Sequence, residues 1–279
     1  MRAQWKAKRD AFLGKIGTGP VVMGILNVTP DSFSDGGRFE DTGAAIAQAR
    51  RMVADGCDIV DVGGESTRPG ATPLSPADEL VRIEPVLAGL EDVLGAPVSI
   101  DTYKSDVAAR AIELGAVLVN DVWGLQKDPA MAGVVAECEA ALVIMHNRAE
   151  KDAAVDIMAD IRRFFERSLE LAAKAAIPRE HIILDPGIGF AKTSQQNRDA
   201  IARVGEFKDY GLPIMIGVSR KAFLGSMSDG AEASLIGTIA VNLAAAASGV
   251  SIFRVHDVAE HVRALWVFHT AWAGPPGRS

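Results

Sequence analysis

The sequence has little cysteine and no long apolar run. Its 279 residues include only Cys57 and Cys138, which are too few for a disulfide framework and which fit a reducing compartment. The longest apolar stretch, 233–250, is interrupted by Ser234 and Asn242, so it lacks the uniform apolar character of a membrane span. We therefore expect a cytoplasmic protein that does not associate with a membrane.

A secretory signal and an excess of positive charge are also missing. Residues 1–15 are basic but contain no apolar stretch of the kind that a signal peptide carries. Lys and Arg number 29 against 36 Asp and Glu, which gives a formal charge of −7 at pH 7. Proteins that bind nucleic acids or membrane surfaces are usually basic, so we expect neither as a partner. An anionic substrate would need cations concentrated in one pocket.

What the sequence does contain is a regular alternation of short apolar runs and helical segments. The runs are rich in Val and Ile, as are strands buried on both faces of a parallel sheet. The expected strands are 21–26, 58–62, 98–100, 117–119, 141–145, 181–184, 213–218 and 251–255. The expected helices are 41–54, one starting at Pro76, 104–114, 130–139, 154–176, 196–208, 233–248 and 258–272.

Local signals support two of these helix boundaries. Ser75 and Asp78 form a capping-box pattern around Pro76, which suits the first helical position. Gly115 follows a helical segment where a glycine commonly ends a helix.

Eight βα units in this length predict an α/β fold, a (β/α)8 TIM barrel. We expect a single domain over 1–279, with a short N-terminal extension at 1–20 and a frayed C-terminal tail at 273–279. A doubly wound open sheet is the alternative, but such a sheet usually has fewer units and carries a nucleotide-binding fingerprint.

Polar residues follow every expected strand, and in a barrel these positions gather at one end, where active sites lie. A single Asp or Asn there could simply cap the next helix. The whole ring is harder to explain in this way, because its members would be partly buried and would need partners. They could pair with one another or bind a polar heterocyclic ligand. The ring comprises Asn27, Glu65, Thr67, Arg68, Asp101, Asn120, His146, Asn147, Asp185, Ser219, Arg220, Lys221, Arg254 and His256.

Several familiar motifs are incomplete. The segment 187–193 resembles a phosphate-binding loop, but Ala191 stands where a glycine should precede Lys192. Ser219 lacks the second half of a nucleophile elbow, and the histidines do not have zinc-ligand spacing. ATP hydrolysis, serine-nucleophile chemistry and zinc hydrolysis therefore have no support.

Two expected loops are long and rich in Gly, Pro and Ser. They span 27–37 and 63–71 and carry charged residues, and the first also carries Phe33. They could be ordinary surface loops or mobile lids over a site that must exclude water.

Seven motifs lie between about Val21 and His256, namely 23–37, 61–71, 99–102, 119–122, 185–190, 219–221 and 254–256. Through these motifs the sequence resembles the dihydropteroate synthase family. The resemblance implies a barrel that joins 6-hydroxymethyl-7,8-dihydropterin diphosphate to p-aminobenzoate and releases pyrophosphate. It also implies a transferase of folate biosynthesis, a homodimer, and inhibition by sulfonamides.

The resemblance also assigns roles to residues. A pterin presents two adjacent N–H donors that a carboxylate can accept together, which suits Asp185. The implied pterin site is Asp101, Asn120, Asp185, Lys221 and Arg254, and the implied diphosphate site is Asn27, Arg254 and His256. Mg²⁺ would be held mainly by diphosphate oxygens, helped by Asn27 and Asp35. The implied p-aminobenzoate site is Phe33, Thr67, Arg68, Pro69, Phe190, Ser219 and Lys221.

The implied reaction is S_N1-like, because diphosphate is a good leaving group and the dihydropterin stabilises a cation. Its implied catalytic residues are Asp101, Lys221, Arg254 and His256. Ala222 stands where some relatives carry a serine, so there only the backbone N–H could meet the carboxylate of p-aminobenzoate.

Two alternatives share the pterin-binding residues. One is a methyltetrahydrofolate corrinoid methyltransferase relative, which should lack the two loop motifs and the Arg-x-His sequence at Arg254. The other is a catalytically silent paralogue that binds pterin, which would be expected to have lost loop residues such as Asp35 and Thr67.

Overall fold

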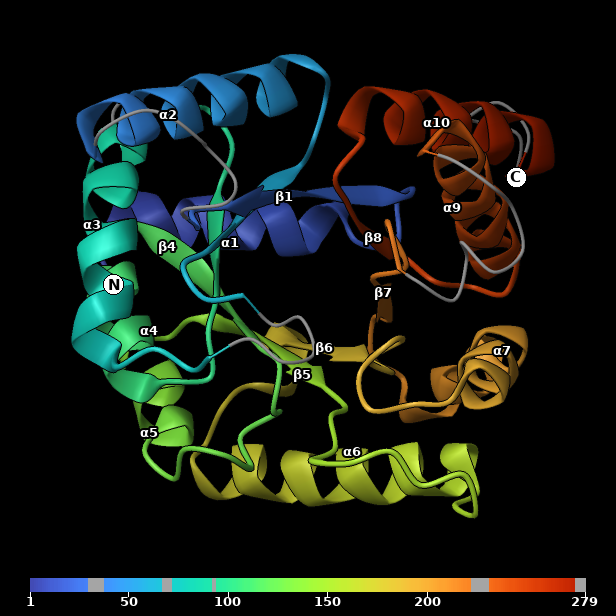
Figure 1. Ribbon diagram of the computed structural model, residues 1–279. Helices are drawn as coiled ribbons and strands as arrows, with labels where there is room; N and C mark the ends of the chain where they lie inside the picture. The colour runs from blue at the N-terminus through green and yellow to red at the C-terminus, as the bar shows by residue number, and fades with distance from the viewer. Residues whose placement is uncertain (30–37, 67–71, 92–93, 222–230, 274–279) are drawn as a thin grey trace.

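A computed structural model describes residues 1–29, 38–66, 72–91, 94–221 and 231–273. Eight parallel strands form one sheet in the order β6-β5-β4-β3-β2-β1-β8-β7. A bridge between Leu184 and Ile214 joins the two end strands, β6 and β7, so the sheet closes into a barrel with helices outside it (Figure 1). The predicted (β/α)8 barrel is confirmed, and the open sheet is excluded.

The strands lie close to the expected runs. They are β1 Val21–Asn27, β2 Ile59–Gly63, β3 Val98–Asp101, β4 Ala116–Asp121, β5 Ala141–Met145, β6 Ile182–Asp185, β7 Met215–Ile216 and β8 Ile252–Val255. The helices are α1 Ala3–Lys15, α2 Arg38–Ala54, α3 Pro76–Glu91, α4 Ser105–Glu113, α5 Met131–Glu137, α6 Ile157–Lys174, α7 Ser194–Ala202, α9 Ala231–Ala247 and α10 Val258–Ala273. Two 3-10 helices, Arg179–His181 and Val204–Tyr210, complete the described elements. None of the helices in this part of the chain is long and apolar enough to cross a membrane.

Capping residues set the helix boundaries. α3 begins at Pro76 as predicted, with the Ser75 hydroxyl accepting from the Asp78 amide, and Gly115 follows α4 with a φ of +105°. α6 begins at Ile157, later than expected, because the Asp156 carboxylate accepts from the first free amides of that helix. The expected helix 196–208 is α7 followed by a 3-10 helix.

The half of the barrel interior near the amino ends of the strands is apolar, and α1 closes this end of the barrel. Phe12 of α1 packs into a cluster of residues near the starts of several strands. Besides Phe12, the cluster consists of Val21, Met23, Ile59, Leu118, Ala141, Val143, Ile183, Met215 and Ile252. α1 runs across the back of the barrel in Figure 1, and its closure of this end leaves the opposite end for ligands.

Helix α1 falls within the N-terminal extension expected at 1–20 and was not predicted. Its sequence is largely polar, and only Trp5, Arg9 and Phe12 are buried. These three positions are spaced four and three residues apart, so they form one narrow stripe on the helix. The Arg9 guanidinium donates to the carbonyl oxygen of Glu139, beyond α5, which ties α1 to the barrel.

The half of the barrel interior near the carboxyl ends of the strands is polar. Side chains alternate between the two faces of a strand, so a residue two positions after an inward-facing one also faces inward. Ile59 faces the apolar interior, so Asp61, two residues later, also faces inward. In the same way, Asn120 lies two residues after Leu118 and Arg254 lies two residues after Ile252, so both face inward. The strands therefore deliver a layer of polar groups to the carboxyl end of the barrel.

Candidate active site

An ion-paired cluster lies at the carboxyl ends of β2, β3, β4 and β8. The Arg254 Nε donates to Asp61 Oδ2 at 2.7 Å, and its terminal nitrogen donates to Asp101 Oδ2 at 2.6 Å. Asn120 Nδ2 donates to the same Asp61 oxygen at 3.0 Å. Burial alone would lower the pKa of Arg254, but the Asp61 and Asp101 carboxylates outweigh it and hold the pKa above its ordinary value.

Three buried oxygens of this cluster have no donor among the described residues. They are Oδ1 of Asp61, Asp101 and Asn120. Burial raises the pKa of Asp101, and the neighbouring Asp61 carboxylate raises it further, against the opposing effect of Arg254. Since buried acceptors without a partner are costly, this group is suited to a ligand that brings several N–H donors.

Asp185, at the end of β6, adds a carboxylate to the same interior. Its side chain is 3% exposed, and its Oδ1 accepts from the Gly187 amide at 2.7 Å. Burial raises the pKa of Asp185 to about 6, although the Gly187 amide and the Lys221 charge lower it. The group is therefore largely ionised at neutral pH and can accept hydrogen bonds from a ligand.

Lys221, which follows β7, lies against Phe190. Its Nζ stands 4.1 Å from the centre of the Phe190 ring, a cation–π contact. A Cβ on Gly189 would lie 2.8 Å from Lys221 Cδ, so the loop after β6 approaches this lysine closely. Burial and the Arg254 charge lower the pKa of Lys221 to about 8, against the opposing effect of Asp185.

His256, after β8, is oriented by Ser219. The Ser219 hydroxyl oxygen accepts from the His256 amide at 3.2 Å and lies 3.0 Å from His256 Nδ1. The Ser219 hydroxyl can donate its proton to Nδ1, and the tautomer that accepts this bond carries the ring proton on Nε2. Burial, together with the charges of Arg220 and Arg254, lowers the pKa of His256 to about 4, so the imidazole is a neutral donor at pH 7.

Asn27 lies beside the ion-paired cluster. A Cβ placed on Gly63 would lie 3.8 Å from Asn27 Oδ1 and 3.7 Å from Asp101 Oδ2. Both oxygens therefore lie next to the same position beside Gly63. Oxygen ligands of this type suit Mg²⁺. No group of three or more His, Cys, Asp or Glu side chains in the described ranges could hold a metal by itself. Asn27 Oδ1 is thus an oxygen of the type that a Mg²⁺ ion can bind, next to the carboxylate of Asp101.

Three members of the expected ring point elsewhere. His146 packs against Lys192 and Asp160, outside the barrel interior. Arg220 pairs with Asp257 at 2.6 Å, and Glu65 pairs with Lys104 at 2.5 Å.

Other expected site residues lie outside the described residues. They are Phe33, Asp35, Thr67, Arg68 and Pro69, together with Ala222 and the segment after it. The sequence left open whether the two loops that carry the first five are surface loops or lids, and the roles of these residues stay predictions.

Asp61 is the site residue that sequence reasoning missed. It was noted only as part of a motif, yet its side chain is fully buried and contacts both Arg254 and Asn120. The signal was present, because a charged residue in the middle of the apolar run Ile59–Gly63 must find a buried partner.

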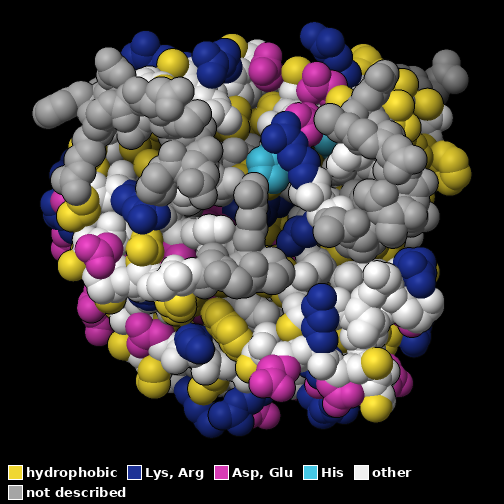
Figure 2. Space-filling view, viewed as in Figure 1, with side chains coloured by type: hydrophobic (Ala, Val, Ile, Leu, Met, Phe, Trp, Pro, Cys, Tyr) yellow, Lys and Arg dark blue, Asp and Glu magenta, His cyan; other side chains and the backbone are white. Residues whose placement is uncertain are grey.

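The arrangement combines carboxylate and amide acceptors with cationic and neutral donors at one end of the barrel. In Figure 2, Lys, Arg and His side chains gather around a hollow near the centre of this face. Such a site can bind a flat heterocycle that has several N–H groups, and it can hold an anionic group next to Arg254 and His256.

Comparisons with known proteins agree with this chemistry. Residues 23–256 match the family described as pterin binding enzyme. Dihydropteroate synthase of Bacillus subtilis is 43% identical over 244 residues, which are 87% of this chain and 85% of that protein.

Solved structures show the same similarity. Dihydropteroate synthase from Clostridium difficile, crystallised in the presence of pteroic acid, has a TM-score of 0.89 and 46% identity, covering 92% of this chain and 98% of that one. The enzyme from Xanthomonas albilineans with 4-aminobenzoic acid has a TM-score of 0.88 and 38% identity, covering 92% and 94%. Another solved dihydropteroate synthase carries a sulfonamide drug.

Proposed function

This chain belongs to the dihydropteroate synthase family of pterin-binding enzymes, transferases of folate biosynthesis that are sulfonamide targets, and we propose how its residues carry out that reaction. The observation that carries the proposal is the set of buried oxygens around Arg254 that have no donor among the described residues. The similarity over most of the chain also favours this reaction over the corrinoid methyltransferase alternative.

The pterin ring binds against Asp185 and Asn120. The Asp185 carboxylate accepts from the two adjacent N–H donors of the 2-amino-4-oxo ring. The free Oδ1 of Asn120 accepts from another ring N–H, and Asp101 completes the polar contacts. Lys221 donates to the oxo and N5 side of the ring. These contacts place the hydroxymethyl carbon of the substrate toward the mouth of the barrel.

The diphosphate binds beside Arg254 and His256. The Arg254 guanidinium already pairs with Asp61 and Asp101, so it is held in place before the substrate arrives. A neutral His256 with its proton on Nε2 donates a hydrogen bond to the leaving oxygen. Mg²⁺, bound by the diphosphate with Asn27 and Asp35, would neutralise part of the negative charge.

The carbon–oxygen bond then breaks and the amine of p-aminobenzoate forms the new carbon–nitrogen bond. In this proposal the Asp101 and Asp185 carboxylates stabilise the cationic dihydropterin. No strong general base is needed, because an aniline nitrogen becomes acidic once it is alkylated. We assign p-aminobenzoate to the surface formed by Lys221 and Phe190, with Ser219 nearby and with Phe33, Thr67, Arg68 and Pro69 of the two loops around it.

The exposed faces of α9 and α10 support a homodimer. Ile236 of α9 and Trp266, Val267 and Trp272 of α10 are more than half exposed, and the two helices pack side by side (Figure 1). Exposed large apolar side chains on neighbouring helices are a feature of interaction surfaces. Trp266→Glu should convert a dimer to a monomer in analytical ultracentrifugation.

The experiment that tests the site is direct. The protein is incubated with dihydropterin diphosphate, p-aminobenzoate and Mg²⁺, and dihydropteroate is measured by mass spectrometry, with Asp185→Asn as the inactive comparison. Substrate labelled with ¹⁸O at the bridging oxygen should also exchange label into non-bridging positions without p-aminobenzoate if diphosphate leaves first. Exchange that requires the amine would favour direct displacement instead.

A further inference from the structure

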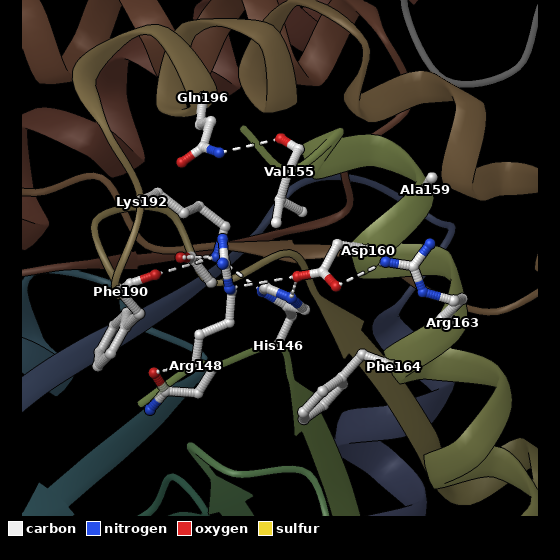
Figure 3. A network of polar contacts seen from close by, with 12 residues as sticks. His146, Arg148, Val155, Ala159, Asp160, Arg163, Phe164, Phe190, Lys192 and Gln196 are labelled. Carbon is white, nitrogen blue, oxygen red and sulfur yellow. Dashed lines mark hydrogen bonds and ion pairs between the residues drawn. The ribbon is translucent and has the colours of Figure 1, made fainter. Parts of the chain in front are cut away.

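A buried lysine lies behind the pterin site and takes no direct part in the reaction described above. Lys192 follows β6 in the segment that resembled an incomplete phosphate-binding loop, and its side chain is 2% exposed. Its Nζ lies 2.8 Å from His146 Nδ1 and donates to the carbonyl oxygens of Gly187 at 2.7 Å and Phe190 at 3.3 Å. Figure 3 shows Lys192 pointing toward His146 among these contacts.

The carbonyl contacts connect Lys192, through Gly187 and Phe190, to two residues with proposed roles, Asp185 and Lys221. The amide of Gly187 donates to the Asp185 carboxylate, and the ring of Phe190 stacks on Lys221. The loop also lies very close to β5, because a Cβ on Gly187 would come within 1.9 Å of the His146 carbonyl oxygen. Only glycine fits there, and its φ of +66° is also one that glycine favours.

We propose that Lys192 is a positioning residue: its ammonium holds residues 186–192 against the end of β5, and so fixes Asp185 for the pterin and Phe190 over Lys221. This inference rests on the proposed roles of Asp185 and Phe190. The inference adds Lys192 to these two residues as one that contacts neither the pterin nor p-aminobenzoate.

The hydrogen-bond count fixes the protonation of the neighbouring histidine. An ammonium has three N–H donors and no acceptor, and the carbonyls of Gly187 and Phe190 take two of them. While Lys192 is charged, the third donor requires a lone pair on His146 Nδ1, so the imidazole is then neutral with its proton on Nε2. That nitrogen lies 3.2 Å from Asp160 Oδ2, which accepts the bond. Burial and the Lys192 charge lower the pKa of His146 to about 4, which agrees with a neutral ring.

The charge of Lys192 also acts on Asp185. Burial lowers the pKa of Lys192 to about 7, against the opposing effect of the Asp185 carboxylate. In return, Lys192 is one of the groups that lower the pKa of Asp185. The charged and titratable groups that face Lys192 are His146 and Arg148 after β5, Asp160 of α6, Asp185 of β6 and Lys221 after β7. Loss of the ammonium would therefore favour the protonated form of Asp185, which cannot accept both pterin donors.

Lys192→Met is the central test, because methionine has a similar length but neither charge nor N–H donors. The exposed Lys174 of α6 supplies the matched control, Lys174→Met. The binding of 6-hydroxymethylpterin is measured by calorimetry between pH 5 and pH 9, with circular dichroism to verify folding. We expect Lys192→Met to weaken binding about tenfold at pH 7 and to move the acid limb upward by about one pH unit, with Lys174→Met unchanged. A folded Lys192→Met protein with the affinity and pH profile of the unmodified protein would overturn the proposal.

Two further measurements keep the outcome interpretable. Asp185→Asn is measured in parallel: if it binds pterin normally, the proposed role of Asp185 fails, whereas a loss there with no effect of Lys192→Met overturns only the inference. If Lys192→Met does not fold, ¹⁵N-histidine NMR on the unmodified protein decides. A neutral His146 with its proton on Nε2 is expected between pH 5 and pH 6.5, where Lys192 carries its charge, and a His146 that is protonated at pH 6 or carries its proton on Nδ1 in this range refutes it.

Discussion

Arg254 Nε lies 2.7 Å from Asp61 Oδ2, although their strands, β8 and β2, are separated by β1. The contact crosses the inside of the barrel, where Asp61 is fully buried. It fixes the guanidinium in place, so the side chain that we assign to diphosphate does not have to be ordered during binding.

Loss of Asp61 should destabilise the fold. Asp61→Ala leaves the Arg254 guanidinium with one carboxylate and leaves Asn120 without its acceptor. Breaking a buried ion pair by removing one partner costs about 3–5 kcal/mol, to be measured by urea unfolding. Glu206→Ala, which breaks an exposed pair with Arg203, should cost less than about 1 kcal/mol. Equal effects of the two substitutions would contradict the buried role of Asp61.

Asp185→Asn should stabilise the protein at high pH while abolishing pterin binding. The folded pKa of Asp185 is about 6, above the value of about 3.9 for an unfolded Asp. The protonated carboxyl therefore favours the folded state below about pH 4, and this contribution is lost as the pH rises through 6. Asparagine has no such dependence, so the variant should gain roughly 2–3 kcal/mol relative to the unmodified protein between pH 4 and pH 8. Urea unfolding at both pH values measures the difference, and a gain independent of pH would argue against the assignment.

His256→Ala should weaken the binding of the diphosphate substrate selectively. Loss of one hydrogen bond to a charged group costs about 1.5–3 kcal/mol, so affinity should fall roughly 10- to 100-fold. Unphosphorylated hydroxymethylpterin should bind almost as before, as calorimetry can show. Ser219→Ala, which removes the hydroxyl that contacts the imidazole, should produce a smaller change in the same direction. An equal loss for both ligands would remove His256 from the diphosphate site.

Phe190→Leu should affect p-aminobenzoate more than pterin. The substitution removes the ring that lies 4.1 Å from Lys221 Nζ, a contact worth about 0.5–2 kcal/mol. We expect the KM for p-aminobenzoate to rise several-fold and the KM for dihydropterin diphosphate to change little in steady-state assays. A selective rise in the KM for the pterin substrate would place Phe190 elsewhere.

Phe12→Ala should destabilise the fold without affecting the site. Phe12 is 1% exposed and packs among the strand starts at the closed end, and truncation of a buried Phe costs about 3–5 kcal/mol. Pterin affinity below the melting temperature should stay unchanged. Gln4→Ala, on the exposed side of α1, is the control and should leave the Tm within a degree or two.

The sequence predicted the barrel and the meeting of several polar residues at its carboxyl end, because both follow from the order of strands. Asp101, Asn120, Asp185 and Arg254 each end or nearly end an apolar run, and the barrel brings such ends together. His146 was placed in the same ring because it also follows a strand. Val143 faces the interior, however, so alternation turns residue 146 outward.

Other features could not be predicted from local patterns. Helix α1 has a largely polar sequence, and its burial depends on strands more than 100 residues away, such as those of Leu118 and Ile183. The role of Lys192 depends on contacts between the loop after β6 and the end of β5, which no spacing along the chain reveals.

The closure of one end of the barrel by α1 also has a consequence for the order in which the substrates bind. Because α1 covers the other end of the barrel in the part of the chain that the structure describes, we expect both substrates to enter, and the product to leave, at the carboxyl ends of the strands. Asn120 and Asp185 are 2% and 3% exposed, whereas Lys221 and Phe190 lie half-buried, so the pterin takes the deeper position in the proposed site. On this proposal we expect the pterin substrate to bind before p-aminobenzoate and dihydropteroate to depart with its benzoate end first. An aromatic amine that arrives first obstructs the route of its own reaction partner, which predicts substrate inhibition at high p-aminobenzoate concentrations.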